Sequence, residues 1–150
     1  FALLHSLDSL NLAQRLNRFA GEANRILPIL LEFNVGGEES KGGWDASDES
    51  TWDSLLPDVS TILDLPHVQI RGLMSMPPLG NDAEDSRRFF YQVRRLRERL
   101  ADQLPGGDWR ELSMGTSLDY AVAVEEGTTL VRVGTAIVGE RSKRRHTPEE

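Results

Sequence analysis

The sequence predicts an α/β fold built on a parallel β-sheet. Five segments of seven or eight residues are rich in Leu, Ile, Val or Phe, and several are continuously apolar, as in strands buried on both faces. Helical patterns lie between these segments, and such an alternation places successive strands side by side and parallel. The predicted strands span residues 1–7, 28–35, 68–75, 109–115 and 129–135.

Four helices fill the intervals between these strands. Pro57 should break or kink the second of them, because proline removes a backbone donor inside a helix. We expect Ser117 to cap the last helix and Gly127 to end it. The predicted helices span residues 8–20, 47–63, 82–104 and 118–126.

The helix predicted at 82–104 is amphipathic. Its apolar residues recur at spacings of three and four, which indicates one face packed on the sheet. They are Phe89, Val93, Leu96, Leu100 and Leu104. Arginines occupy the opposite face, and we interpret that face as a solvated surface. They are Arg87, Arg88, Arg94, Arg95 and Arg97.

Composition excludes several classes of protein. The 150 residues are enough for about one domain, and 17 basic against 24 acidic residues give a net charge of −7, which argues against a nucleic-acid partner. No apolar run is long enough to cross a membrane, so we expect no membrane partner. Cysteine is absent, which rules out disulfides, zinc–thiolate sites and cysteine nucleophiles. We expect a cytoplasmic protein.

Common catalytic and nucleotide motifs are missing. The histidines at 5, 67 and 146 share no metal-ligand spacing, so we expect no metal site, and no G-x-S-x-G elbow occurs. Gly134 to Gly139 has the glycine spacing of a P-loop, but Glu140 and Arg141 stand where that motif needs Lys and Ser or Thr. No G-x-G-x-x-G sequence follows a strand, which leaves a dinucleotide site unsupported.

Two turns near the C-terminus predict a phosphate site. Residues 113–117, Ser-Met-Gly-Thr-Ser, follow one strand, and Gly134-Thr135 follow the next. Small residues let the backbone approach a ligand, and successive turns late in a parallel barrel are a usual place for a phosphate group. The alternative is a pair of ordinary tight turns.

Two polar side chains are candidates to line the same site. Arg132 alternates with Val131 and Val133 along its strand, which directs it to the barrel interior, where a charge needs a partner or a ligand. The alternative is a buried ion pair with Glu32 or Glu111. Asn34 ends its strand at the same edge, the alternative being an Asx turn into the following loop.

Five blocks of sequence, in order, resemble the family of pyridoxal 5′-phosphate (PLP) homeostasis proteins. Mild departures from the family are Thr116, where it tends to have Met, and Val138, where it tends to have Phe. The likeness runs to about Arg141. The blocks are LLHSLDS (3–9), LLEFNVGGEESKGG (30–43), GLMSMPPLG (72–80), LSMGTSLDY (112–120) and EEGTTLVRVGTAIVGER (125–141).

The resemblance implies a (β/α)₈ TIM barrel like the N-terminal domain of alanine racemase, which binds PLP through a lysine Schiff base on its first strand. It implies that Arg132 faces the pyridine nitrogen and that Ser113 and the Gly134-Thr135 turn hold the phosphate. We add Met114 and Asn34 as cofactor-binding residues. It also implies a protein without established catalysis, which buffers PLP in vitamin B6 homeostasis inside the cell and delivers it, with apo PLP enzymes as expected partners.

A complete barrel has eight strands and needs on the order of 200 to 250 residues. We therefore expect an N-terminally truncated fragment with about five C-terminal βα units: residues 1–141 as the C-terminal part of the barrel, residues 142–150 as a disordered tail, and a monomeric parent. We assign the Schiff base to neither Lys41, expected on an exposed loop, nor Lys143. Two other functions stay open: a PLP-dependent amino-acid racemase, or a fragment that binds another phosphorylated metabolite.

Overall fold

The structure is a computed structural model that describes residues 2–78, 80 and 82–139. Its centre is a six-stranded parallel sheet in which the strands follow one another in chain order, except for a short strand, β3 (Trp44–Asp45), that pairs with β2 off the main path. The predicted parallel sheet is confirmed. The other strands are β1 (Leu4–Leu7), β2 (Leu27–Asn34), β4 (Val68–Met74), β5 (Glu111–Thr116) and β6 (Leu130–Arg132).

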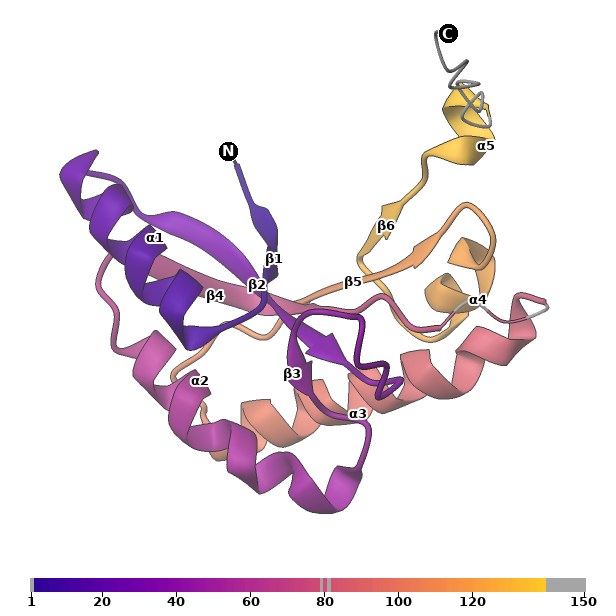
Figure 1. Cartoon of the computed structure of the whole chain (residues 1–150), viewed down its shortest axis with the longest axis horizontal. Helices are drawn as coiled ribbons and strands as arrows, with labels where there is room; N and C mark the ends of the chain where they lie inside the picture. Colours follow the sequence, from indigo (N-terminus) through magenta and orange to yellow (C-terminus); the bar gives the residue numbers. More distant parts are fainter. Residues whose placement is uncertain (1, 79, 81, 140–150) are drawn as a thin grey trace, which may run out of the picture.

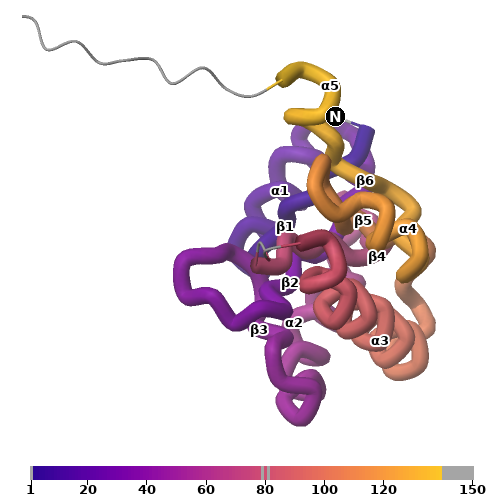
Figure 2. Tube along the Cα trace, turned by 90° about the vertical axis from the view of Figure 1, so that its right-hand side faces the viewer, coloured from indigo at the N-terminus to yellow at the C-terminus, as the bar shows by residue number. Residues whose placement is uncertain are grey.

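The helices flank this sheet. Figure 1 shows α1, α2 and α3 along one side of the curved sheet, with β1 and β6 at its two ends. In both views α5 projects at the end of the molecule away from α2 (Figure 2). In the described part of the chain, no helix is both long and apolar enough to cross a membrane. The helices are α1 (Leu10–Glu22), α2 (Leu56–Leu63), α3 (Arg87–Gln103), α4 (Tyr120–Glu125) and α5 (Thr135–Val138).

Pro57 divides the second predicted helix, as expected. A 3₁₀ helix, η1 (Glu49–Leu55), precedes α2, and Pro57 lies in the first turn of α2, where a missing N–H costs no intrahelical bond. The third helix also begins with 3₁₀ structure, η2 (Glu84–Ser86). The expected ending of α4 is found too, because Gly127 follows it with φ +89°.

The two faces of the sheet have different chemistry. Ile29, Leu31 and Phe33 of β2 belong to the apolar core shared with the helices, and from β5 Met114 belongs to the same core. The residues between them point to the opposite face, because side chains alternate along a strand. Glu32, Ser113 and Arg132 thus share the inner face that a barrel interior would occupy, and polar groups gather there.

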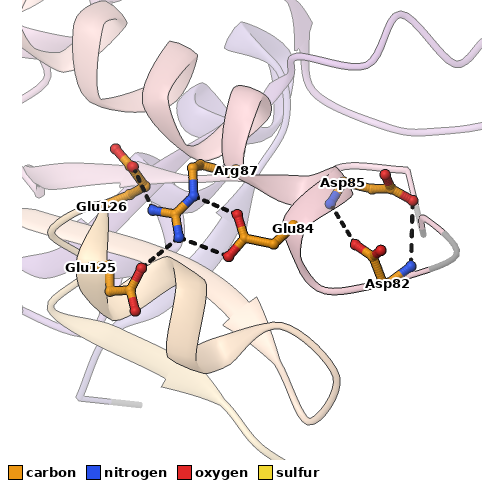
Figure 3. A network of polar contacts seen from close by, with 6 residues as sticks. All are labelled: Asp82, Glu84, Asp85, Arg87, Glu125 and Glu126. Atoms are coloured by element: carbon orange, nitrogen blue, oxygen red, sulfur yellow. Dashed lines mark hydrogen bonds and ion pairs between the residues drawn. The ribbon is translucent and has the colours of Figure 1, made fainter.

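The arginine face of α3 is not merely solvated, which corrects the prediction for Arg87. Arg87 lies among three glutamates (Figure 3): its Nε and Nη2 donate to Glu84 at 2.7 and 2.8 Å, Nη2 also donates to Glu125 at 2.5 Å, and Nη1 donates to Glu126 at 3.0 Å. The first of these acids belongs to η2, whereas the other two end α4. Arg94 also lies 3.6 Å from Glu126. These contacts raise the pKa of Arg87 and lower that of Glu84. The network fastens the start of α3 to the helix that follows β5.

We expect Arg87→Met to lower the melting temperature, because it leaves three clustered carboxylates without their shared cation while keeping most of the side-chain stem. Arg97→Met is the matched control, since Arg97 has no ion pair in the described part of the chain. Thermal unfolding followed by circular dichroism at low and high salt measures the difference. Added salt should reduce it, because salt screens exposed charges. Equal melting temperatures for the two variants would show that the network contributes nothing to stability.

Candidate functional site

A cavity of about 790 Å³ lies at the C-terminal ends of β4, β5 and β6. The turn after β5 and the turn after β6 form much of its wall, and Lys41 with the segment after β4 contributes the rest. Because parallel strands end at one edge of a sheet, segments far apart in the sequence meet here. The lining residues are Lys41, Met76, Pro77, residues 115–119, Arg132 and residues 134–136.

The two turns are joined through one hydroxyl group. Ser117 Oγ accepts hydrogen bonds from the backbone N–H of Gly134 and of Ala136, both at 3.1 Å. Two main-chain donors therefore converge on a single oxygen at the cavity wall. The prediction that Ser117 caps α4 is wrong, because its side chain bonds the neighbouring turn instead.

Asp119 fixes the turn after β5 and precedes the first residue of α4. Its buried carboxylate accepts from Thr116 N at 2.7 Å and from Thr116 Oγ1 at 3.1 Å. This residue is absent from the site predicted from the sequence. The spacing Thr116-x-x-Asp119 was the available signal, since Ser or Thr followed three residues later by an acid is typical of a helix start.

Arg132 lies inside the curve of the sheet, bonded mainly to backbone oxygens. Its Nη1 donates to Ser113 O at 2.9 Å and to Ser113 Oγ at 2.6 Å, and its Nη2 donates to Ser75 O at 2.9 Å. Among the described residues, neither Glu32 nor Glu111, the two acids predicted as its partners, makes a direct ion pair with Arg132. Glu111 instead accepts a hydrogen bond from Thr129. Burial lowers the pKa of Arg132, and the negative charges of Glu32 and Asp119 oppose this shift.

Glu32 is the acid that balances this charge from a distance. Burial and the neighbouring Asp8 raise the pKa of Glu32, while Arg132 acts in the opposite direction. The inner face therefore holds one arginine with two nearby carboxyl groups, those of Glu32 and Asp119. A cation held in this way can present its remaining N–H donors to a ligand in the cavity.

The sequence-predicted residues fall into two groups. Arg132, Gly134 and Thr135 line the cavity, and Ser113 lies behind Arg132 with only 1% of its surface exposed. Met114 does not line it: its side chain is buried in the core against the helices, on the other face of the strand from Ser113. Asn34 does not line it either. Its side-chain nitrogen donates to Glu38 O at 2.8 Å and thus fastens the loop after β2.

Lys41 is not the freely exposed loop residue that the sequence analysis expected. Its Nζ donates to Met76 O at 2.9 Å and Pro77 O at 3.0 Å, and it lies 2.5 Å from Glu38 Oε2. Two backbone oxygens and the Glu38 carboxylate thus hold Lys41, which forms part of the cavity wall. Lys143 and the tail predicted at 142–150 lie outside the described residues.

We expect Gly115→Ala to destabilise the protein more than Gly127→Ala does. Both glycines have φ near +90°, where an added Cβ costs about 1–2 kcal/mol. At Gly115 the new Cβ would also lie 2.6 Å from Ala123 Cβ, whereas at Gly127 no described atom lies within 4 Å. The clash should add at least about 1 kcal/mol by forcing α4 away from β5. Urea unfolding measures both variants, and equal losses would refute close packing at this turn.

Comparison with known proteins identifies the family. The family model described as "Alanine racemase, N-terminal domain" matches residues 2–142. The "Pyridoxal phosphate homeostasis protein" of Aquifex aeolicus is 42% identical over 143 residues, which cover 93% of this chain and 58% of that protein. The human protein of the same name is 34% identical over 161 residues, covering 99% of this chain and 54% of that protein. The chain thus spans less than three fifths of the length of these relatives.

Solved structures agree. PipY of Synechococcus elongatus is 40% identical and superposes with a TM-score of 0.80 without PLP and 0.75 with PLP bound, over 90% of this chain and about 60% of PipY. Diaminopimelate decarboxylase of M. jannaschii, at 13% identity and a TM-score of 0.73, shares the fold alone. The parallel sheet is therefore part of an alanine-racemase-type (β/α)₈ barrel. The chain belongs to the alanine racemase N-terminal domain family, and over nearly its whole length it is similar to pyridoxal phosphate homeostasis proteins.

Proposed function

We propose that this chain binds PLP in the cavity at the ends of β4, β5 and β6, and that it serves PLP homeostasis rather than catalysis. The single observation that carries the proposal is the convergence of the Gly134 and Ala136 N–H groups on one oxygen, beside an arginine fixed in the same cavity. Relatives over 30% identical are named for PLP homeostasis, and PipY has a PLP-bound structure.

The phosphate site is the point that Ser117 Oγ now occupies. A phosphate oxygen is a stronger acceptor than a hydroxyl group and can take over the N–H donors of Gly134 and Ala136. Ser117 can then turn its own hydroxyl proton toward the anion, as can Thr135 at the cavity wall. The residues present therefore fit a phosphate group, and Asp119 keeps the first turn in shape through Thr116.

The pyridine ring fits against Arg132. PLP, when bound, supplies an aldehyde for a lysine amine and a ring that can draw electrons from an attached amino acid. A guanidinium is a donor only and stays charged, so Arg132 can hydrogen-bond the pyridine nitrogen without giving up its proton. That contact leaves the ring a weaker electron sink. Ser113 supports this contact because its hydroxyl oxygen accepts a hydrogen bond from Arg132 and so holds the guanidinium in place.

The titratable groups at the cavity support a carrier more than a racemase. Racemisation needs an acid–base group free to exchange protons with the substrate. Among the described lining residues, Asp119 is bonded to Thr116, Lys41 is held by two backbone oxygens and an ion pair with Glu38, and Arg132 is held by two serines. We extend the proposal to buffering PLP in the cytoplasm and delivering it to apo-enzymes, whereas the names of the relatives support PLP homeostasis alone.

Ala136→Asp tests the phosphate site. This exposed position lies beside the converging N–H groups, so a carboxylate there should repel the phosphate and weaken PLP binding at least about tenfold, or about 1.4 kcal/mol. Ala136→Asn has the same shape without the charge and should bind PLP as the wild type does. Equilibrium dialysis with PLP and with pyridoxal, which lacks the phosphate, separates the effects. Equal PLP affinities for the two variants would place the phosphate elsewhere.

Arg132→Ala tests the ring contact. We expect this variant to change the absorption spectrum of bound PLP more than it changes PLP affinity, because the phosphate contacts stay. Arg110→Ala is the control, since Arg110 pairs with Asp108 before β5, at the opposite end of the strands. If Arg132→Ala leaves the spectrum unchanged, Arg132 does not contact the ring.

A spectrum showing no bound PLP in the wild type, with another phosphorylated compound retained, would favour the alternative ligand.

A further inference from the structure

His5 of β1 contacts the arginine site across the inside of the curved sheet. Its Nδ1 lies 2.9 Å from Ser113 Oγ on β5, although 108 residues separate the two in sequence. In the sheet, β2 and β4 lie between β1 and β5. The contact therefore crosses the inner face instead of following the hydrogen-bond ladder, and it links the edge strand to the group that holds Arg132.

The hydroxyl proton of Ser113 fixes the direction of this contact. Arginine can only donate, so Ser113 Oγ accepts from Arg132 Nη1 at 2.6 Å. The hydroxyl has one proton, and His5 Nδ1 is its acceptor among the described residues. Because Ser113 is 1% exposed, bulk water does not compete for that proton. In this arrangement, in which Ser113 donates to Nδ1, His5 is neutral and carries its own proton on Nε2.

We propose that His5 is a positioning residue whose neutral imidazole fixes the Ser113 hydroxyl and through it the Arg132 guanidinium, so that proton uptake by His5 loosens the ring contact of the cofactor. The inference rests on the proposed function, which it deepens by adding control through pH. His5 acts through Ser113 and Arg132.

The charges around His5 favour its neutral form. Burial and the positive charge of Arg132 lower the pKa of His5. The other charged groups of the inner face are Glu32 on β2, Asp8 after β1 and Asp119 before α4. The pKa of Glu32 is raised, so Glu32 becomes neutral at a higher pH than an ordinary glutamate and then no longer favours a charged His5. Protonation of His5 would put a second cation beside Arg132 and aim an N–H at an oxygen that already accepts one.

The direction of the pH effect follows from this shift. An unfolded histidine titrates near ~6.5, and the folded His5 titrates below that value, so the folded state binds fewer protons between the two. The relay, by which we mean the hydrogen-bonded chain from His5 through Ser113 to Arg132, is intact above about pH 6.5. Both the relay and the stability it contributes are lost as the pH falls through the lowered pKa of His5.

Imidazole nitrogen NMR on the wild-type chain tests the relay without any cofactor. We expect the His5 ring to carry its proton on Nε2 and to titrate at a lower pH than a free histidine, and Ser113→Ala to remove the preference for this tautomer. A proton on His5 Nδ1 at neutral pH, or an ordinary titration, would overturn the proposal. This measurement stands even if the chain binds no PLP, a result that would overturn only the proposed function.

Two substitutions separate positioning from mere packing. His5→Asn keeps an acceptor close to the place of Nδ1 but cannot titrate, so its PLP spectrum should match the wild type at pH 7.5 and stay constant down to pH 5.5. His5→Leu removes the acceptor and should give the low-pH spectrum at every pH. His67→Asn, a histidine change far from the site, is the control. A wild-type pH profile in His5→Leu would refute the role of His5.

Discussion

The buried guanidinium of Arg132 is the group around which the inner face of this sheet is arranged. A charge at that depth must be hydrogen-bonded, and the structure supplies backbone oxygens from two other strands, Ser113 O on β5 and Ser75 O at the end of β4. Arg132 thus ties three successive strands together at the edge where ligands bind in parallel sheets. Moving the register of β6 by one residue would turn the arginine to the helical side and leave these oxygens without a donor.

Other features of the inner face follow from this charge. Glu32 and Asp119 offset it, while Ser113 and His5 extend its hydrogen bonds across the curve to β1. The outer face has no such requirement and is filled with apolar side chains against the helices. One strand can serve both needs because its side chains alternate, as Ser113 and Met114 do.

The sequence predicts the parts of this arrangement that depend on local patterns. Strand–helix alternation gives the parallel sheet, and the valines beside Arg132 give its inward direction. Applied to β5, the same alternation rule would have kept Met114 out of the site. The two residues of β3 are too few for a pattern. Ser117, His5 and Arg87 have partners 17, 108 and 38 or 39 residues away, and no periodicity predicts contacts of that kind.

The hydrogen bonds of the two turns that we propose as the phosphate site bear on how tightly PLP would be held. An N–H group left without an acceptor in a cavity wall is costly, and binding an anion there would recover that cost in full. Here Ser117 Oγ already satisfies Gly134 and Ala136, so an incoming phosphate exchanges one acceptor for another. The gain is limited to the difference between a hydroxyl and a charged oxygen. Such an exchange suits the proposed role, because a protein that delivers PLP must release it, and Ser117 Oγ can accept from the two N–H groups again on release.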